Sequence, residues 1–444
     1  MTDTICALAT APGGALGIIR VSGPAALSIT GSVCRAITPA TPANTIHFAR
    51  ITDGAEVIDE AMVSIFRAPH SYTGEDTAEI SCHGSRYILN RVLELLVGQG
   101  CRMAGPGEFT QRAYLNGKMD LSQAEAVADL IASTNRATHH LAMSQLRGGI
   151  STELKRLRDH LLKLTSLLEL ELDFSDHEDL EFADRSELLQ LAQQIDAHIR
   201  RLAASFQTGN ALKQGIPVAI IGAPNVGKST LLNALLGEER AIVSDIQGTT
   251  RDAIEETITL DGVLFRFIDT AGIRHTSDQI EQMGIERSLT AAQRARIVIL
   301  MTEPGVPYPD ITVRDDQTLI HVVNKSDKGV AVANSSLFTL HSSLLSISAK
   351  YGIGIESLKT KLIAAIPHVD DNDVIVANAR HYEALCRAQS SLERVLEGLN
   401  NGLSGDLLSE DLRDVLNILS EITGGQITPQ ETLNNIFKHF CIGK

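Results

Sequence analysis

A glycine-rich segment, Gly222-Ala-Pro-Asn-Val-Gly-Lys-Ser229, has the G-x-x-x-x-G-K-[ST] spacing of a phosphate-binding loop. Glycine lets the backbone turn its N–H groups inward around phosphate oxygens, and the N-terminus of a following helix favours their negative charge. Lys228 is expected to reach the β- and γ-phosphates, and the Ser229 hydroxyl to bind Mg²⁺. The segment therefore predicts a site for a nucleoside triphosphate.

The base of that nucleotide is indicated by Asn324-Lys-Ser-Asp327, which follows the strand-like run 319–323. The Asp327 carboxylate can accept hydrogen bonds from N1–H and the 2-amino group of guanine. Adenine lacks this pair of donors and would leave a buried charge unpaired. Ser348-Ala-Lys350, at the end of a further strand-like run, is expected to support the base through backbone N–H groups. The order of these motifs favours GTP.

Two segments between these motifs are expected to sense the γ-phosphate. Asp269-Thr-Ala-Gly272 offers an aspartate for the Mg²⁺ shell and a glycine that can turn toward phosphate, and Gly248-Thr-Thr-Arg-Asp252 offers a threonine hydroxyl for the metal. Four motifs in this order along the chain, Gly222–Ser229, Gly248–Asp252, Asp269–Gly272 and Asn324–Asp327, predict a GTPase.

The position after the DTAG motif is Ile273, where many small GTPases have a glutamine that orients the attacking water. An apolar side chain cannot orient water, so the transition state has to be stabilised from elsewhere. Two alternatives stay open: a potassium ion ligated by Asn225, or a carboxylate such as Glu281 that positions water. Taken alone, Glu281 is more typical of a charge on a helix surface.

These motifs need a sheet to position them, and the periodicity predicts one. The run Ile216–Gly222 is typical of a buried strand, 228–237 of a helix, and strand-like segments follow at 257–260, 263–269, 296–301, 319–324 and 344–349. Strands alternating with helices favour a mostly parallel α/β domain. Helical patterns cover 120–211, with Ser122 as a possible cap of the first helix, and return after Pro367. We therefore predict an α/β domain inserted into a helical domain; a separate C-terminal helical domain is the alternative.

Composition excludes several classes of protein. The 444 residues, 43% hydrophobic and 21% charged, are typical of a globular chain of about three domains. A net charge of −15 argues against a strong non-specific nucleic-acid binder, although a local patch can still contact RNA. No apolar run is long enough to span a membrane, and the N-terminus is not typical of a secretory signal. Six cysteines without CxxC spacing fit a reducing cytoplasm.

The motifs and their flanks together resemble the bacterial and organellar MnmE (TrmE) family of tRNA uridine modification GTPases over essentially the full length. The flanks that carry the resemblance are Gly17-Ile-Ile-Arg-Val-Ser-Gly23, Ser71-Tyr-Thr-Gly-Glu-Asp76, Pro106-Gly-Glu-Phe-Thr110, Leu115-Asn-Gly-Lys118 and the terminal Cys441-Ile-Gly-Lys444. The GTPase motifs alone indicate only the superfamily, whereas the flanks indicate the member. One departure is Ser85, where the family usually has a second glycine.

The resemblance implies an architecture and a reaction. An α+β, folate-binding-like domain at 1–118 would form a homodimer. A helical domain at 119–211 and 371–444 would surround a G domain at 215–368. The protein would act on tRNA in a heterotetramer with an FAD-dependent partner, MnmG (GidA). The reaction would add a carboxymethylaminomethyl or aminomethyl group to carbon 5 of the wobble uridine, using a one-carbon unit from a 5-formyl or methylene tetrahydrofolate.

The resemblance also implies site residues in the G domain. GTP would be bound by Asn225, Val226, Gly227, Lys228, Ser229, Thr230, Ser244, Asp245, Ile246, Gln247, Gly248, Thr249, Thr250, Asp269, Thr270, Ala271, Gly272, Asn324, Lys325, Asp327, Ser348, Ala349 and Lys350. Mg²⁺ would be held by Ser229 and Thr250. K⁺ would be held by Asn225, Ser244, the Ile246 carbonyl and Thr249, and would bring together the two G domains of the dimer. Glu281 matches the family's water-positioning glutamate, and Arg274 resembles a switch residue.

Four residues would bind the folate: Arg20, Glu79, Lys118 and Lys444. Cations suit the glutamate tail of a folate, and a carboxylate suits the amino-pyrimidine edge of its pterin. Surface salt bridges are the alternative for these charges without the resemblance. Cys441 matters for modification in the family, so we interpret it as a catalytic candidate, with a buried structural cysteine as the alternative.

A ribosome-assembly GTPase of the Era or Der type is the competing function. Such assembly factors carry a KH-like RNA-binding module after the G domain, with a GxxG loop in a basic setting. The C-terminal part of this chain has instead a helical pattern with an acidic balance. The flanks therefore favour tRNA modification.

Overall fold

The computed structural model describes residues 3–173, 185–237, 255–268, 290–309, 311–329, 344–366, 373–425, 430–438, 440, 441 and 443. The chain divides into two compact units. The first unit contains Met1–Ala132, Ala142–Ile199 and Glu383–Lys444, and the second contains Ser133–Leu141 and Arg200–Tyr382. Each unit is therefore assembled from segments that are far apart in the sequence.

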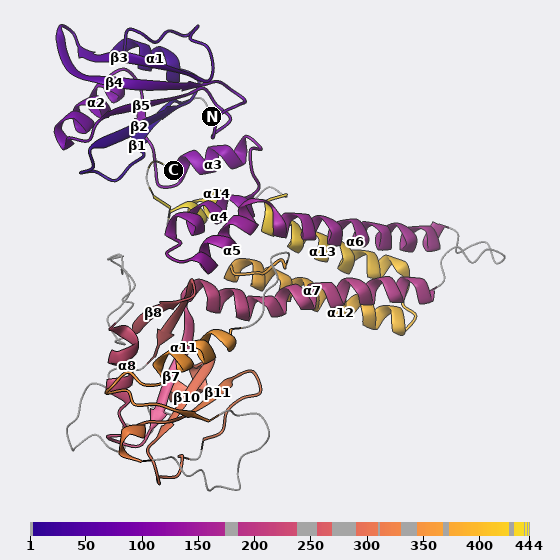
Figure 1. The fold of residues 1–444 in the computed structure, drawn as a ribbon. Coiled ribbons are helices and arrows are strands. Elements are labelled where there is room, and N and C mark those ends of the chain that lie inside the picture. Colours follow the sequence, from indigo (N-terminus) through magenta and orange to yellow (C-terminus); the bar gives the residue numbers. More distant parts are fainter. Residues whose placement is uncertain are drawn as a thin grey trace. The chain divides into compact units, whose positions relative to one another are not determined.

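The first unit begins with a six-stranded sheet of order β3-β4-β5-β2-β1-β6 (Figure 1). Its elements are β1 (Ile5–Leu8), β2 (Leu16–Ser22), α1 (Ala26–Val33), β3 (Thr45–Asp53), β4 (Glu56–Phe66), β5 (Thr77–His83), α2 (Arg86–Gly98), β6 (Arg102–Met103) and α3 (Glu108–Leu115). Only the β1–β6 pair is parallel. The short β-like runs of the sequence at 17–22 and 76–81 lie in strands β2 and β5.

Alternation along these strands decides which side chains enter the core. Ile19 and Val21 of β2, and Ala78 and Ile80 of β5, are buried against α1 and α2. Because side chains alternate between the two faces of a sheet, the residues between them point to the other face. Arg20 and Glu79 are such residues, and they are direct partners in the β2–β5 register. The alternation along the strands therefore places both charged side chains together, on the face of the sheet opposite α1 and α2.

The helical part of the first unit is built on amphipathic helices of 8 to 30 residues. These are α4 (Leu121–Ala132), α5 (Arg136–Leu146), α6 (Gly149–Asp173), α7 (Arg185–Gln214), α12 (Ala379–Asn400), α13 (Gly405–Thr423) and α14 (Gln430–Phe437), of which α5, α7 and α12 continue into the second unit. The α6 helix buries Leu154, Leu157, Leu161, Leu164 and Leu168 against α13. Spacings of three and four residues place these leucines on one helical stripe, which can pack against a single partner helix.

The start of α4 differs from the prediction. Asp120, rather than Ser122, caps the helix: its carboxylate accepts the backbone N–H of Gln123 at 2.9 Å, and the Gln123 side chain accepts the N–H of Asp120 at 2.9 Å. This reciprocal pair is a capping box. Ser122 lies inside the first turn, where its hydroxyl donates to Asp120 at 2.7 Å. Both residue types are good caps, and the helix begins two residues earlier than expected.

The second unit contains a six-stranded sheet of order β12-β11-β10-β7-β9-β8. Its elements are β7 (Ile216–Gly222), α8 (Lys228–Leu236), β8 (Glu256–Leu260), β9 (Val263–Phe267), β10 (Ile297–Thr302), β11 (Thr318–Val323), a 3₁₀ turn (Ser326–Lys328), β12 (Leu345–Ser346) and α11 (Ile355–Ala364). All pairs are parallel except β8–β9. The predicted α/β domain is confirmed.

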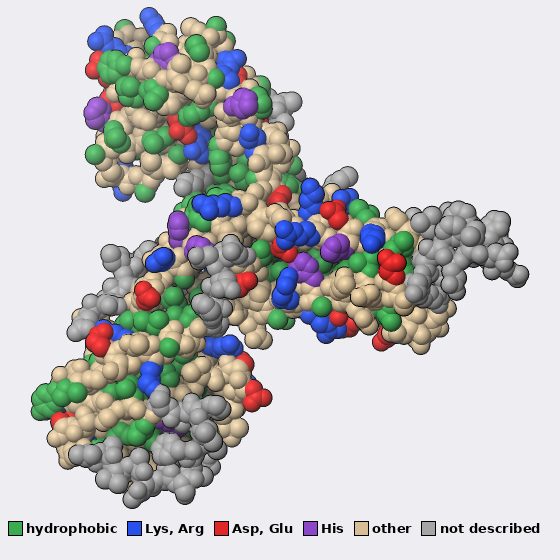
Figure 2. All heavy atoms as spheres, turned by 45° about the vertical axis from the view of Figure 1, so that its right-hand side comes forward, with side chains coloured by type: hydrophobic (Ala, Val, Ile, Leu, Met, Phe, Trp, Pro, Cys, Tyr) green, Lys and Arg blue, Asp and Glu red, His purple; other side chains and the backbone are tan. Residues whose placement is uncertain are grey.

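Two further features concern the helices and the surface charges of the described residues. No helix among the described residues is long and apolar enough to cross a membrane. Acidic and basic side chains are interspersed on the helical part in the view of Figure 2. The predicted domain boundaries stay predictions, although Arg200–Gln214 of α7 belongs to the same compact unit as the α/β sheet.

Candidate functional site

The phosphate-binding loop connects β7 to α8 at the carboxyl edge of the parallel sheet. The chain continues to β8 and β9 on one side of β7 and to β10, β11 and β12 on the other. Such a reversal of strand order opens a crevice where α/β proteins bind ligands. The loop therefore lies where the sequence predicted it, between a buried strand and a helix N-terminus.

Two glycines of the loop are required by close contacts. A Cβ atom on Gly222 would lie 2.5 Å from the Met301 carbonyl oxygen, and one on Gly227 would lie 2.3 Å from Asn324 Nδ2. Gly227 also has φ +100°, which L side chains rarely adopt, and Asn225 has φ +61°. The glycine pattern of the motif thus reflects backbone shape and packing against β10 and Asn324.

Lys228 is the first residue of α8, and its ammonium group lies back over the loop. Its Nζ donates to the carbonyls of Gly222 at 2.6 Å and Ala223 at 3.0 Å. Burial lowers the pKa of Lys228 below its ordinary value. The ammonium is therefore held at the loop, where a phosphate oxygen can replace a carbonyl as its acceptor.

Asn324 ties three of the predicted motifs together. Its side chain is buried, donates to the Val226 carbonyl of the phosphate loop at 2.8 Å and accepts the N–H of Ala349 at 2.9 Å. These loops follow β7, β11 and β12, whose carboxyl ends share one edge of the sheet. One amide side chain therefore sets the spacing between the phosphate loop and the base loops.

Asp327 lies on the 3₁₀ turn after β11 with an exposed carboxylate. The Ser348 hydroxyl donates to its Oδ1 at 2.6 Å, and this hydrogen bond holds the pKa of Asp327 below its ordinary value. The preceding Lys325 has φ +60°, and its Nζ pairs with Glu303 at 2.6 Å. The charged acceptor needed for guanine is thus present beside the Ser348–Lys350 loop. Lys350 itself places its ammonium over the Tyr351 ring.

Replacing Asn324 with alanine is expected to weaken GTP binding by about 10- to 100-fold. The change leaves a buried carbonyl and a buried N–H without a partner, which costs about 1–3 kcal/mol for each group. Titration with a fluorescent guanine nucleotide measures the affinity. Asn400→Ala is the matched control, because Asn400 makes an exposed amide–carbonyl bond in α12 at 2.9 Å. Equal affinities of the two variants would contradict the role of Asn324.

Part of the predicted site lies outside the described residues. These predictions are Ser244, Asp245, Ile246, Gln247, Gly248, Thr249, Thr250, Asp269, Thr270, Ala271, Gly272, Arg274, Glu281 and Lys444. Of the predicted GTP residues that are described, Ser229 and Thr230 lie in the first turn of α8 beside the loop. Their predicted roles, including Ser229 as a magnesium ligand, stay predictions.

The residues predicted for folate lie in the first unit. Arg20 and Glu79 form an ion pair at 2.8 Å, and their side chains are 16% and 25% exposed. The Arg20 guanidinium lies over the rings of Tyr72 and Phe109, 5.3 and 5.6 Å from their centroids. The structure therefore brings Arg20 and Glu79 together in a half-buried setting with two aromatic walls.

Lys118 lies at the loop of residues 67–76, which connects β4 to β5 and carries Tyr72. Its Nζ donates to the Pro69 carbonyl at 2.9 Å, and the side chain is exposed. Cys441 is also exposed, and its carbonyl accepts the N–H of Gly107 at 3.3 Å. The alternative of a buried structural cysteine at 441 is therefore wrong.

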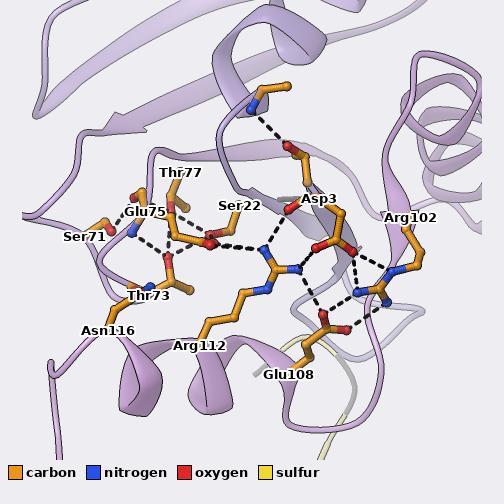
Figure 3. Close-up of polar contacts among 12 residues, drawn as sticks. Asp3, Ser22, Ser71, Thr73, Glu75, Thr77, Arg102, Glu108, Arg112 and Asn116 are labelled. Carbon is orange, nitrogen blue, oxygen red and sulfur yellow. Dashed lines mark hydrogen bonds and ion pairs between the residues drawn. The ribbon is translucent and has the colours of Figure 1, made fainter. Parts of the chain in front are cut away.

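A buried arginine that sequence reasoning missed holds the 67–76 loop and the N-terminus (Figure 3). Arg112 of α3 is 1% exposed and contacts Asp3 at 2.8 Å, Glu75 at 3.2 Å and Glu108 at 3.1 Å. Glu75 also accepts from the Ser22 hydroxyl at 2.8 Å. The network supports the loop that places Tyr72 against Arg20. No local sequence pattern indicates that an arginine is buried. The position of Arg112 in an amphipathic helix, in contrast, could have been recognised from the sequence.

Comparisons with known proteins agree with this geometry. A family profile described as "GTP-binding protein TrmE N-terminus" matches residues 4–118, and one described as "MnmE helical domain" matches 121–441. The "tRNA modification GTPase MnmE" of Bacteroides fragilis is 54% identical over 100% of this chain and 99% of its own length. The protein of the same name from Porphyromonas gingivalis is 50% identical over 100% and 98%.

Among solved structures, the G domain of the T. maritima FeoB iron transporter is 23% identical. It covers 34% of this chain and 99% of its own, at a TM-score of 0.23, which is too low to bear on function. The full-length relatives and the two profiles confirm the resemblance and the fold class. The chain belongs to the MnmE (TrmE) family of tRNA modification GTPases.

Proposed function

We propose that this chain binds and hydrolyses GTP as part of an enzyme that modifies the wobble uridine of certain tRNAs. The observation that carries the proposal is the Asn324 linkage, which joins the phosphate loop to the Ser348–Lys350 loop beside Asp327. It supports a guanine-nucleotide site in a chain that aligns over its full length with tRNA modification GTPases. These full-length relatives favour tRNA modification over the competing ribosome-assembly function.

The residues of this chain have distinct tasks in the proposed hydrolysis. Lys228 and the loop N–H groups bind the β- and γ-phosphates, and Asp327 accepts from the guanine edge. A bound Mg²⁺ would neutralise phosphate charge and would be held by Ser229 and Thr250. Ser229 supports this assignment, because it lies in the first turn of α8 beside the loop and its hydroxyl is an oxygen ligand of the kind that a hard cation prefers. Glu281 is proposed to position the attacking water, and Arg274 to act in the switch segment.

Potassium is proposed to bind at the phosphate loop through Asn225, Ser244, the Ile246 carbonyl and Thr249. Asn225 supports this assignment, because it is exposed on the loop and its backbone is left-handed at φ +61°. Amide, carbonyl and hydroxyl oxygens are hard ligands that suit such a cation. Potassium in this position would add positive charge beside the β- and γ-phosphates, which Ile273 cannot supply.

Replacing Asn225 with alanine is expected to abolish the stimulation of GTP hydrolysis by potassium while largely sparing nucleotide binding. The ratio of hydrolysis rates in potassium and in sodium measures the effect. Asn225→Gly separates ligand loss from backbone strain, since glycine adopts φ > 0 at no steric cost. Asn44→Ala is a control for a left-handed asparagine elsewhere, at φ +57°. An unchanged rate ratio in both Asn225 variants would contradict the ion assignment.

The chemistry on tRNA is proposed to use a 5-formyl or methylene tetrahydrofolate bound near Arg20, Glu79, Lys118 and Lys444. The Arg20–Glu79 pair supports this proposal, because it offers a cation and a carboxylate beside the Tyr72 and Phe109 rings. Such a setting fits a flat heterocycle with an anionic tail. Cys441 is proposed to take part in the transfer. Carbon 5 of the wobble uridine would receive a carboxymethylaminomethyl or aminomethyl group.

The proposed enzyme works with other macromolecules. The active assembly is proposed to be a homodimer joined in a heterotetramer with an FAD-dependent MnmG (GidA) protein, acting on tRNA in the cytoplasm. The family assignment supports the tRNA substrate. The acidic net charge of −15 fits an enzyme that contacts RNA through a limited surface.

Mass spectrometry of tRNA nucleosides from cells with and without the gene tests the proposed function. We expect the side chain on carbon 5 of the wobble uridine to disappear on deletion and to return with the intact gene. A gene carrying Lys228→Ala should fail to restore it. The Asn400→Ala gene should restore it and serves as control. An unchanged nucleoside profile on deletion, with altered ribosome-subunit profiles, would favour an Era- or Der-type function instead.

A further inference from the structure

The end of the chain lies against the N-terminal sheet domain of the same unit. We use the term C-terminal tail for its described residues after α14, which are Phe440, Cys441 and Gly443. The Gly443 carbonyl accepts from Arg20 Nη1 at 3.3 Å, and the Cys441 carbonyl accepts the N–H of Gly107 at 3.3 Å. Two hydrogen bonds thus join the tail to Arg20 of β2 and to Gly107, which precedes α3.

Glycine is needed on each side of this contact. Gly443 is buried with φ +96°, and a Cβ atom there would lie 2.2 Å from the Leu8 carbonyl oxygen. Gly107 has φ +64°, and its Cβ would lie 2.8 Å from the Cβ of Phe440. Contacts this short involve backbone or the stem of a side chain, which cannot move away cheaply. A side chain at either position therefore displaces the tail.

Apolar packing fixes the other end of the tail. The Phe440 ring lies 5.1 Å from the ring of Phe437, which is 2% exposed in a small core with Leu121 and Leu433. Cys441 lies between this anchor and Gly443, and its side chain is exposed. Two residues of chain span at most about 7 Å, so the backbone of Cys441 stays within that distance of Gly443.

We propose that Gly443 is a positioning residue whose lack of a side chain lets the tail dock and present Cys441 at the Arg20–Glu79 pair. Gly107 performs the same task from the N-terminal domain. The bond from Arg20 to the Gly443 carbonyl also fixes the guanidinium between Tyr72 and Phe109. The inference rests on the proposed folate function of that pair.

The test compares Gly443→Ala with the unmodified full-length chain. Binding of 5-formyltetrahydrofolate is measured by calorimetry, and the dissociation constant is expected to rise by about tenfold or more, since a lost hydrogen bond to a charged group costs about 1.5–3 kcal/mol. Tail docking is measured independently by tryptic release of peptide 439–444 after the exposed Lys438. Release is expected to be faster in the variant. GTP hydrolysis should be unchanged, because the phosphate loop lies in the other compact unit.

Gly425→Ala is the matched control, since the nearest atom to a Cβ there lies at 3.7 Å, an ordinary contact. Gly107→Ala should reproduce both effects of Gly443→Ala. The double variant should be no worse than either single one, because all three changes undo the same docking. A general loss of folding would instead lower the thermal midpoint and GTP hydrolysis together.

The outcomes separate the two proposals. Wild-type peptide release and folate affinity in Gly443→Ala would overturn the positioning role. Faster release with unchanged folate affinity would also overturn it, because docking would then not serve the site. If the unmodified chain binds no folate although Gly443→Ala releases the peptide faster, the proposed folate function is wrong while the glycine-dependent docking stands.

Discussion

An Asp327→Asn variant is expected to lose its preference for GTP and to hydrolyse xanthosine triphosphate instead. The asparagine amide presents a donor where guanine also has a donor, its 2-amino group. Xanthine has a carbonyl oxygen at that position and keeps N1–H, so the amide can pair with both. Sites built to pair with a given donor reject the wrong partner by about 10⁴-fold, which is the change expected in the ratio of kcat/KM values.

The hydrogen bonding around Asp327 is compatible with an asparagine at this position. The Ser348 hydroxyl donates to Asp327 Oδ1 at 2.6 Å, and an asparagine Oδ1 can accept the same bond. Asp261→Asn is the control, because it removes the same charge in the same unit at φ +49°, which asparagine tolerates. Steady-state hydrolysis of both nucleotides by both variants provides the ratio. Retained selectivity for GTP in Asp327→Asn would mean that the base is read elsewhere.

Replacing Arg112 with methionine is expected to destabilise the N-terminal domain by about 3–5 kcal/mol. This is the usual cost of removing one partner from a buried ion pair and leaving the other charge uncompensated. Here Glu75, 14% exposed, would lose its arginine partner, whereas Glu108, 11% exposed, would keep its ion pair with Arg102. Urea unfolding of the full chain, followed by hydrogen exchange in peptides of the N-terminal sheet, measures the change.

Arg50→Met is the control for the loss of an arginine from the same domain. Arg50 pairs with Glu60 across β3 and β4 at 3.0 Å, but the side chains are 68% and 48% exposed. Exposed pairs contribute about 0–1 kcal/mol, so this variant should be close to the unmodified chain. Equal effects of the two substitutions would contradict the importance of burial at Arg112.

The same network gives stability a defined dependence on pH. Burial acts to raise the pKa of Glu108, but hydrogen bonds from Arg102, the Gly105 N–H and Arg112 outweigh it and hold that pKa below its ordinary value. Because the folded pKa is depressed, this contribution to stability is complete above the unfolded pKa, about 4.3. It is lost as the pH falls through the folded pKa. Arg112→Met should therefore weaken the acid dependence of unfolding.

Local patterns were enough to predict the sheets and the GTP motifs. The apolar run 319–323 predicted β11, and its end placed Asn324 at the carboxyl edge of the sheet. The short β-like runs 17–22 and 76–81 form the strands that carry Arg20 and Glu79. Their pairing depended on the register between β2 and β5, which neither strand specifies alone.

Contacts between distant segments were not predictable from one sequence. Arg112 meets Asp3 across 109 residues, and Gly443 meets Arg20 across 423. Such contacts depend on how α3 and the tail pack, whereas sequence periodicity indicates only which face of an element is apolar. The choice of Asp120 over Ser122 as cap shows the same limit locally, because two good capping residues stand two positions apart.

The Asn324 linkage has a consequence for how this protein can vary during evolution. Among the described residues, the side chain bonds to main-chain groups of Val226 and Ala349, so neither neighbour contributes its own side chain to the linkage. Amino-acid substitutions at positions 226 and 349 are therefore limited by the volume of the surrounding core. Position 324 itself admits no replacement, because aspartate lacks the donor and glutamine is one methylene longer. Selection for nucleotide binding therefore acts on a single residue that sets the spacing of three loops.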